Sequence, residues 1–183
     1  MAYTAKVLRA LISCPSDVDI RDVRAVQAAI ARWNVLLGEQ FGSIVVPVHW
    51  SEHASAAFGS PPQDILNEQL VDTVDFAIAI FWTRLGSPTS AAQSGTAEEI
   101  TRIAAAGKSV SVLRCLRPVD ASNLDAEQFA SLGVYLKDLR GHALLLSYRD
   151  AGTLASQVDT ILTRLVTHIP LNAPLDGNTA QAG

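Results

Sequence analysis

The chain has few of the residues that form disulfides or bind metals. Only two of its 183 residues are cysteines, Cys14 and Cys115, and its four histidines lack the spacing of metal ligands. Each cysteine ends an apolar run, where a free thiol behaves as a small buried hydrophobic group. We therefore expect two core thiols rather than a disulfide, no metal site and no bound cofactor.

Long apolar runs and clusters of basic residues are missing as well. The net charge is −4 with the acids scattered along the chain, which disfavours direct binding to nucleic acid. The N-terminal apolar stretch is interrupted by Lys6 and Arg9, unlike a signal peptide, and no run reaches membrane-spanning length. These features predict a soluble cytoplasmic protein with no membrane partner.

Strand-like apolar runs alternate with stretches of helical spacing, which is typical of a parallel sheet covered on both faces. We predict an α/β fold, a flavodoxin-like doubly wound five-stranded sheet of order 2-1-3-4-5 with helices on both faces. The predicted strands span residues 6–13, 43–50, 75–82, 109–116 and 142–148. We expect this domain to occupy residues 1–170, and residues 171–183 to be a disordered tail or the start of a linker to a further domain.

In such a sheet, ligands bind beyond the carboxyl ends of the strands, where the strand order reverses. That point falls between the first and third strands, so "SCPSDVD" (13–19) and "FWTRLG" (81–86) are expected to face each other. Gly59 and two prolines predict a loop over the same rim at 51–64, followed by a helix over about 62–70.

Two adjacent acids, Glu98 and Glu99, follow the loop that leaves the third strand. One interpretation is structural, with Thr96 as the N-cap of a helix and Glu99 completing a capping box. The other is a carboxylate facing the ligand crevice. Neighbouring helical residues point about 100° apart, so we expect one glutamate to face inward and the other to be a solvated surface acid.

The stretch "SGTAEEI", with "LISCPSDVDIRDVRAVQAAI" and "DILNEQLVDTVDFAIAIFWTRLG" before it, resembles the Toll/interleukin receptor (TIR)-like domains of bacterial signalling and defence proteins. Gly95 and Thr96 occupy the place of the Trp-Cys pair that precedes the catalytic glutamate in TIR domains, which puts Glu99 at the catalytic position. "GTAEE" is also similar to the Gly-Thr-x-x-Glu stretch of nucleoside 2-deoxyribosyltransferases, again at Glu99.

The resemblance implies an NAD glycohydrolase or cyclase in defence signalling, with NAD as a substrate and a homo-oligomer forming on activation. A non-enzymatic module for self-association or nucleotide sensing is an alternative, and a nucleoside hydrolase or deoxyribosyltransferase-like enzyme is another. Nicotinamide leaves from a cationic ring and needs no proton donor, whereas a neutral base needs one. Residues 83–96 contain no Asp or Glu, unlike the deoxyribosyltransferases, which favours NAD.

Five further residues are candidates for substrate binding. Arg84 could hold a pyrophosphate while Trp82 stacks on a ring, although Trp82 could equally end a buried strand and Arg84 pair with a surface acid. Ser16 is predicted as the N-cap of the first long helix. It ranks with Ser13 and Thr96 as a residue that lines the ligand site.

Overall fold

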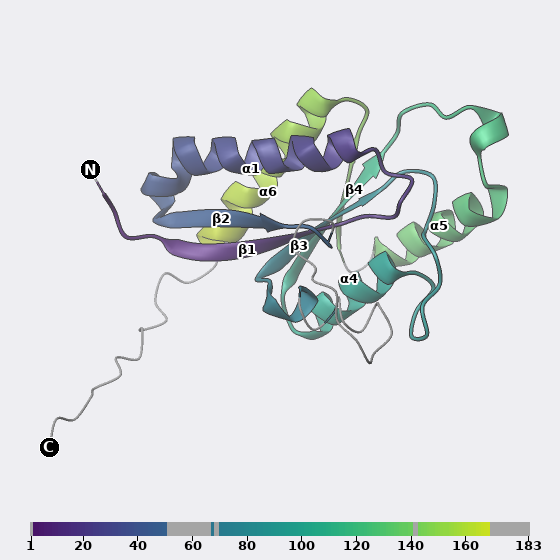
Figure 1. Ribbon diagram of the computed structural model, residues 1–183, viewed down its shortest axis with the longest axis horizontal. Helices are drawn as coiled ribbons and strands as arrows, with labels where there is room; N and C mark the ends of the chain where they lie inside the picture. Colours follow the sequence, from purple (N-terminus) through teal and green to yellow (C-terminus); the bar gives the residue numbers. More distant parts are fainter. Residues whose placement is uncertain (1, 51–66, 68–69, 141–142, 169–183) are drawn as a thin grey trace, which may run out of the picture.

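The computed structural model describes residues 2–50, 67, 70–140 and 143–168. These residues form a five-stranded parallel sheet of order β2-β1-β3-β4-β5, which confirms the predicted flavodoxin-like α/β fold (Figure 1). The predicted loop at 51–64, nearly all of the predicted helix at 62–70 and the tail at 171–183 lie outside the described residues. The strands are β1 (Lys6–Ser13), β2 (Ser43–Val48), β3 (Phe76–Phe81), β4 (Ser109–Cys115) and β5 (Leu144–Tyr148).

The central strand β3 reads "FAIAIF", and all six of its residues are buried. A strand with helices on both faces needs apolar side chains in both directions, which explains this unbroken run. In the register, Ala10 of β1 pairs with Phe76 and Ser13 pairs with Ala79. β1 and β3 therefore lie side by side although the chain forms a long helix and β2 between them, and the strand order reverses at this pair.

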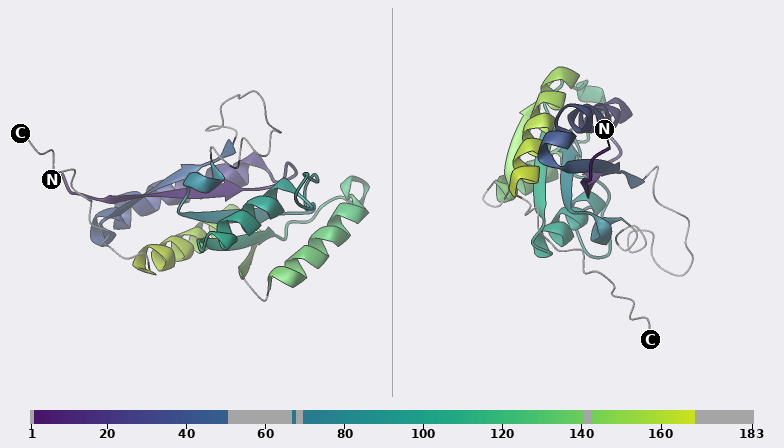
Figure 2. Two further views of the ribbon diagram at one scale, coloured as in Figure 1. Left: turned by 90° about the horizontal axis from the view of Figure 1, so that it is seen from below. Right: turned by 90° about the vertical axis from the view of Figure 1, so that its left-hand side faces the viewer.

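Helices of the described residues cover both faces of the sheet (Figures 1 and 2). α1 (Ile20–Phe41) and α6 (Ala151–His168) pack together on one face, where the Trp33 indole donates a hydrogen bond to Thr163 Oγ1 at 3.1 Å. α4 (Gly95–Ala105) and α5 (Ala126–Leu139) lie on the other face. Short 3-10 turns η1 (Val71–Thr73) and η2 (Ala121–Asn123) precede β3 and α5.

The apolar positions that predicted the first helix are its buried face, since Val23, Val26, Ile30 and Trp33 all lie in the core. The predicted cap was wrong. Asp19, not Ser16, is the N-cap residue, and its carboxylate accepts a hydrogen bond from the amide of the residue two places on. The helix therefore begins three residues later than a Ser16 cap would allow.

Within the described ranges, no helix combines the length and apolar character that crossing a bilayer requires.

Candidate functional site at the switch point

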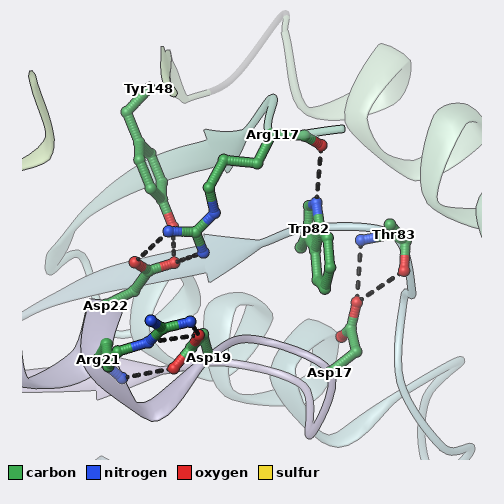
Figure 3. A network of polar contacts seen from close by, with 8 residues as sticks. All are labelled: Asp17, Asp19, Arg21, Asp22, Trp82, Thr83, Arg117 and Tyr148. Carbon is green, nitrogen blue, oxygen red and sulfur yellow. Dashed lines mark hydrogen bonds and ion pairs between the residues drawn. The ribbon is translucent and has the colours of Figure 1, made fainter. Parts of the chain in front are cut away.

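The segments that leave β1 and β3 meet as predicted. The carboxylate of Asp17 accepts hydrogen bonds from the backbone amide and the hydroxyl of Thr83, each at 2.9 Å (Figure 3). It also accepts one from the backbone amide of Arg84 at 3.1 Å. A single carboxylate thus satisfies the first donors of the loop after β3. Those amides are occupied by the protein itself rather than offered to a ligand phosphate.

Glu99 faces the end of β1. The hydroxyl of Ser13, the last residue of β1, donates a hydrogen bond to Glu99 Oε2 at 2.5 Å. Ser13 is only 2% exposed and Glu99 is half-buried. The contact joins residues that are 86 positions apart, at the edge of the sheet where the strand order reverses.

The predicted capping box does not form. Ser94 is the N-cap residue of α4, and its hydroxyl accepts a hydrogen bond from the amide of Ala97 at 3.1 Å. Thr96 lies inside the first turn, with its side chain buried. Glu99 is therefore the fifth residue of the helix, too far along to reach back to the cap as a capping-box acid does. Its carboxylate instead accepts the hydrogen bond from Ser13 at the end of β1.

Glu98 is not the solvated surface acid that the sequence predicted. It is half-buried and accepts hydrogen bonds from Asn67 Nδ2 at 2.6 Å and from the Thr89 hydroxyl at 2.5 Å. The two glutamates do point to different partners, as their helical spacing requires. Glu98 ties the start of α4 to Asn67 and to the preceding loop, while Glu99 contacts β1.

The environment of Cys14 shows that this thiol is buried beside several carboxylates. Burial, followed by the negative charges of Glu99, Asp17 and Asp22, raises the pKa of the Cys14 thiol to about 12. Its Sγ lies 3.9 Å from Nε2 of His49, at the end of β2. The thiol is therefore neutral at physiological pH, and carboxylates dominate the local field.

The contacts of Trp82 and Arg84 match the structural alternative considered for each. The Trp82 indole donates a hydrogen bond to the backbone carbonyl of Arg117 at 3.1 Å, and the ring packs partly against the core. Arg84 Nη2 lies 3.5 Å from Asp125 Oδ2, with the two side chains 45% and 43% exposed. Ser16 is exposed on the turn before α1.

A second polar network, which the sequence did not indicate, joins Asp22, Arg117 and Tyr148 (Figure 3). Asp22 is 2% exposed and accepts hydrogen bonds from both Nη atoms of Arg117, at 2.9 and 2.5 Å, and from the Tyr148 hydroxyl at 2.6 Å. Burial and then the bond to Asp22 raise the pKa of Tyr148, and the same carboxylate raises the pKa of Arg117. The network ties α1 to the carboxyl ends of β4 and β5.

The described part of the chain contains no cluster of side chains suited to bind a metal ion. No group of three or more His, Cys, Asp or Glu side chains there is placed to hold an ion. Both cysteines are free thiols, Cys115 buried and Cys14 partly buried.

No family model and no curated protein matches this sequence. Among solved structures, the chain is similar to translation elongation factor SelB from Methanococcus maripaludis. The apo form matches with a TM-score of 0.57 at 10% identity, covering 94% of this chain and 39% of that one. The complex with the GTP analogue GPPNHP matches with a TM-score of 0.51 at 12% identity, covering 96% and 37%.

A further match is oxidised flavodoxin 1 from Bacillus cereus, with a TM-score of 0.40 at 11% identity, covering 91% of this chain and 100% of that one. This chain spans about two fifths of the length of the SelB chains. At these identities the likeness to SelB concerns the fold alone, so function has to be argued from the site.

Proposed function

We propose that this domain is a TIR-like NAD glycohydrolase or cyclase that cleaves the nicotinamide–ribose bond with Glu99 as the catalytic carboxylate. The observation that carries the proposal is the hydrogen bond from Ser13 to Glu99 across the switch point. It places a half-buried carboxylate where open α/β sheets bind ligands, held by a side chain from the neighbouring strand.

The chemistry requires one well-placed carboxylate. As the bond to nicotinamide breaks, positive charge develops on the ribose ring, and a nearby carboxylate stabilises or traps it. Nicotinamide departs as a neutral molecule, so no acid has to protonate it. The loop over 83–96 supplies no acid, which is compatible with this leaving group and unsuited to a neutral purine or pyrimidine.

The charge of the crevice supports the same substrate. Burial is the main cause of the raised pKa of Cys14, and the charges of Glu99, Asp17 and Asp22 raise it further, so these carboxylates disfavour an additional negative charge beside them. The same field attracts the cationic nicotinamide ring and stabilises the cationic transition state. The anionic pyrophosphate of NAD has to lie farther from these carboxylates. The backbone amides of Thr83 and Arg84 in the loop after β3 cannot bind it, because they already donate to Asp17.

Arg84 is the residue we assign to that pyrophosphate, with Trp82 beside it and Ser13, Ser16 and Thr96 lining the remainder of the site. An exposed ion pair contributes only about 0–1 kcal/mol, so Asp125 holds Arg84 weakly and a diphosphate can displace it. By resemblance, NAD is a substrate rather than a cofactor, and the domain acts in cytoplasmic bacterial defence signalling as a homo-oligomer.

The alternative is a non-enzymatic module that self-associates or senses a nucleotide. Its specific support is that Asp17 already satisfies the amides at the crevice and Asp125 already pairs with Arg84. In that case Glu99 and Ser13 form a structural contact between α4 and β1, and no bond is cleaved.

One experiment distinguishes the enzyme from the binding module. The purified chain is incubated with NAD at increasing protein concentration, and release of nicotinamide is measured for wild type, Glu99→Gln and Glu98→Gln. We expect Glu99→Gln to lower turnover on the order of 10²- to 10⁴-fold and Glu98→Gln to retain activity, since glutamine still accepts hydrogen bonds. Wild-type protein that releases no nicotinamide at any concentration supports the binding module instead.

A further inference from the structure

A cavity of about 510 Å³ lies away from Glu99, between the edge of the sheet and the end of α5. Its lining residues lie on β4 and β5, just after β4, at the end of α5 (Figure 1 shows α5) and just before β5. Leu116, Ala143 and Leu145 are among the apolar ones, and Arg114, Arg140 and Ser147 are the polar ones. Cavities of this volume hold small organic ligands in many proteins.

Arg114 packs against α5 with one of its guanidinium donors buried and unpaired. It lies next to Ser147 in the register of β4 and β5, and its guanidinium carbon is 5.6 Å from the centroid of the Phe129 ring on α5. Its Nε is buried and has no hydrogen-bond partner in the described part of the chain. Burying an unpaired donor is unfavourable, so this arrangement is expected where a ligand supplies the acceptor.

Tyr135 on α5 does not line the cavity but has a second unpaired donor. Its hydroxyl is buried and has no hydrogen-bond partner among the described residues. Its ring packs edge-on against Phe81 at 5.9 Å, and Phe81 is the register neighbour of Arg114 on β3. Burial and the charge of Asp138 raise the pKa of Tyr135 to about 12, so the hydroxyl keeps its proton at neutral pH.

The charge of the cavity is positive. Two of its described lining residues are arginines, and none of them is a carboxylate. Guanidinium groups bind phosphate and carboxylate through paired N–H donors. A phosphate monoester carries a charge of about −1.5 to −2 near pH 7 and matches two arginines, whereas a carboxylate neutralises only one of them.

We propose that this cavity binds the phosphate monoester of a small organic molecule, with Arg114 and Arg140 holding the phosphate and the leucine-rich wall contacting the organic part. The cavity does not share a lining residue with the Glu99 site. The proposal therefore stands or fails independently of NAD cleavage.

The test is calorimetric titration of the full chain with phenyl phosphate, in parallel with inorganic phosphate and benzoate. We expect saturable binding of phenyl phosphate, weaker binding of inorganic phosphate because it lacks the apolar part, and weaker binding of benzoate because it carries one charge. Arg114→Gln and Arg140→Gln should each weaken phenyl phosphate binding about tenfold or more, since each removes a charged hydrogen-bond donor.

Arg24→Gln is the matched control, because Arg24 is an exposed arginine on α1, on the opposite face of the sheet. It should bind phenyl phosphate as the wild type does. Arg140 is also exposed, so its variant is expected to fold even if Arg114→Gln is destabilised. Absence of saturable binding to the wild type, unchanged affinity in both Arg114→Gln and Arg140→Gln, or tighter binding of benzoate than of phenyl phosphate would overturn the proposal.

Discussion

The hydroxyl of Ser13 and the carboxylate of Glu99 meet 2.5 Å apart at the point where β1 and β3 diverge. Ser13 ends its strand with a buried side chain, and Glu99 reaches it from the second turn of α4. A hydrogen bond from a buried hydroxyl fixes the orientation of the carboxylate, and such orientation is what a catalytic group requires from its surroundings.

Replacing this hydroxyl tests that role. Ser13→Ala should lower the rate constant for NAD cleavage about tenfold, with a small change in KM and in melting temperature, since alanine fills most of the same space. Steady-state kinetics and thermal denaturation provide the measurements. Ser156→Ala is the control, because Ser156 is an exposed serine on α6 outside the proposed site, and it should leave kcat unchanged. Equal activity in the two variants would contradict a positioning role for Ser13.

The alkylation rate of Cys14 tests how strongly burial and the neighbouring carboxylates raise the pKa of its thiol. A pKa raised from 9.0 to about 12 reduces the thiolate fraction at neutral pH roughly a thousandfold relative to an ordinary cysteine. We expect Cys14 to react slowly with iodoacetamide, with a rate that rises up to about pH 12. Glu99→Gln removes the largest charge contribution to that pKa and should speed the reaction at a given pH.

Mass spectrometry of the peptide that contains Cys14 separates its alkylation from that of Cys115. Glu98→Gln is the matched control, because Glu98 is not among the charges that act on this thiol. A Cys14 rate that is the same in the Glu99→Gln and Glu98→Gln variants would show that Glu99 does not set the local field.

Asp22 should be the most sensitive charged residue for stability. It is buried and accepts three hydrogen bonds, two of them from Arg117. Asp22→Ala leaves Arg117 and Tyr148 without their acceptor and should cost about 3–5 kcal/mol in the free energy of unfolding, measured with urea. Asp159→Ala removes the half-exposed pair with Arg32 and should cost less than about 1 kcal/mol. Similar losses in the two variants would argue against a special role for the network.

The sequence predicted the strand order because buried parallel strands read as plain apolar runs, as "FAIAIF" does. It also predicted that Asp17 and Thr83 would be close, because parallel strands end at one edge of the sheet. Caps were mispredicted because Ser16, Asp19, Ser94 and Thr96 are all suitable N-cap residues, and the choice depends on where the chain enters each helix.

The polar networks were missed for a different reason. Asp22 lies in the first turn of α1, where an acid normally faces solvent and favours the helix dipole. Only the fold brings Arg117 and Tyr148, about 95 and 126 positions away, to its carboxylate. The prediction that Glu98 is a solvated surface acid was wrong for the same reason, because its partner Asn67 belongs to another segment. Long-range pairs of this kind leave no local pattern in a single sequence.

The last prediction concerns the charge of the leaving group. NAD and NADH share every group except the nicotinamide ring, which is cationic in NAD and neutral in NADH. We expect the chain to release nicotinamide from NAD and to leave NADH uncleaved, because the acidic crevice around Glu99 favours a cation and residues 83–96 supply no proton donor. Neutral nucleosides and deoxynucleosides should also remain intact. Chromatography of the products identifies each released base, and release of a purine or pyrimidine would assign the site to nucleoside hydrolysis or deoxyribosyl transfer instead.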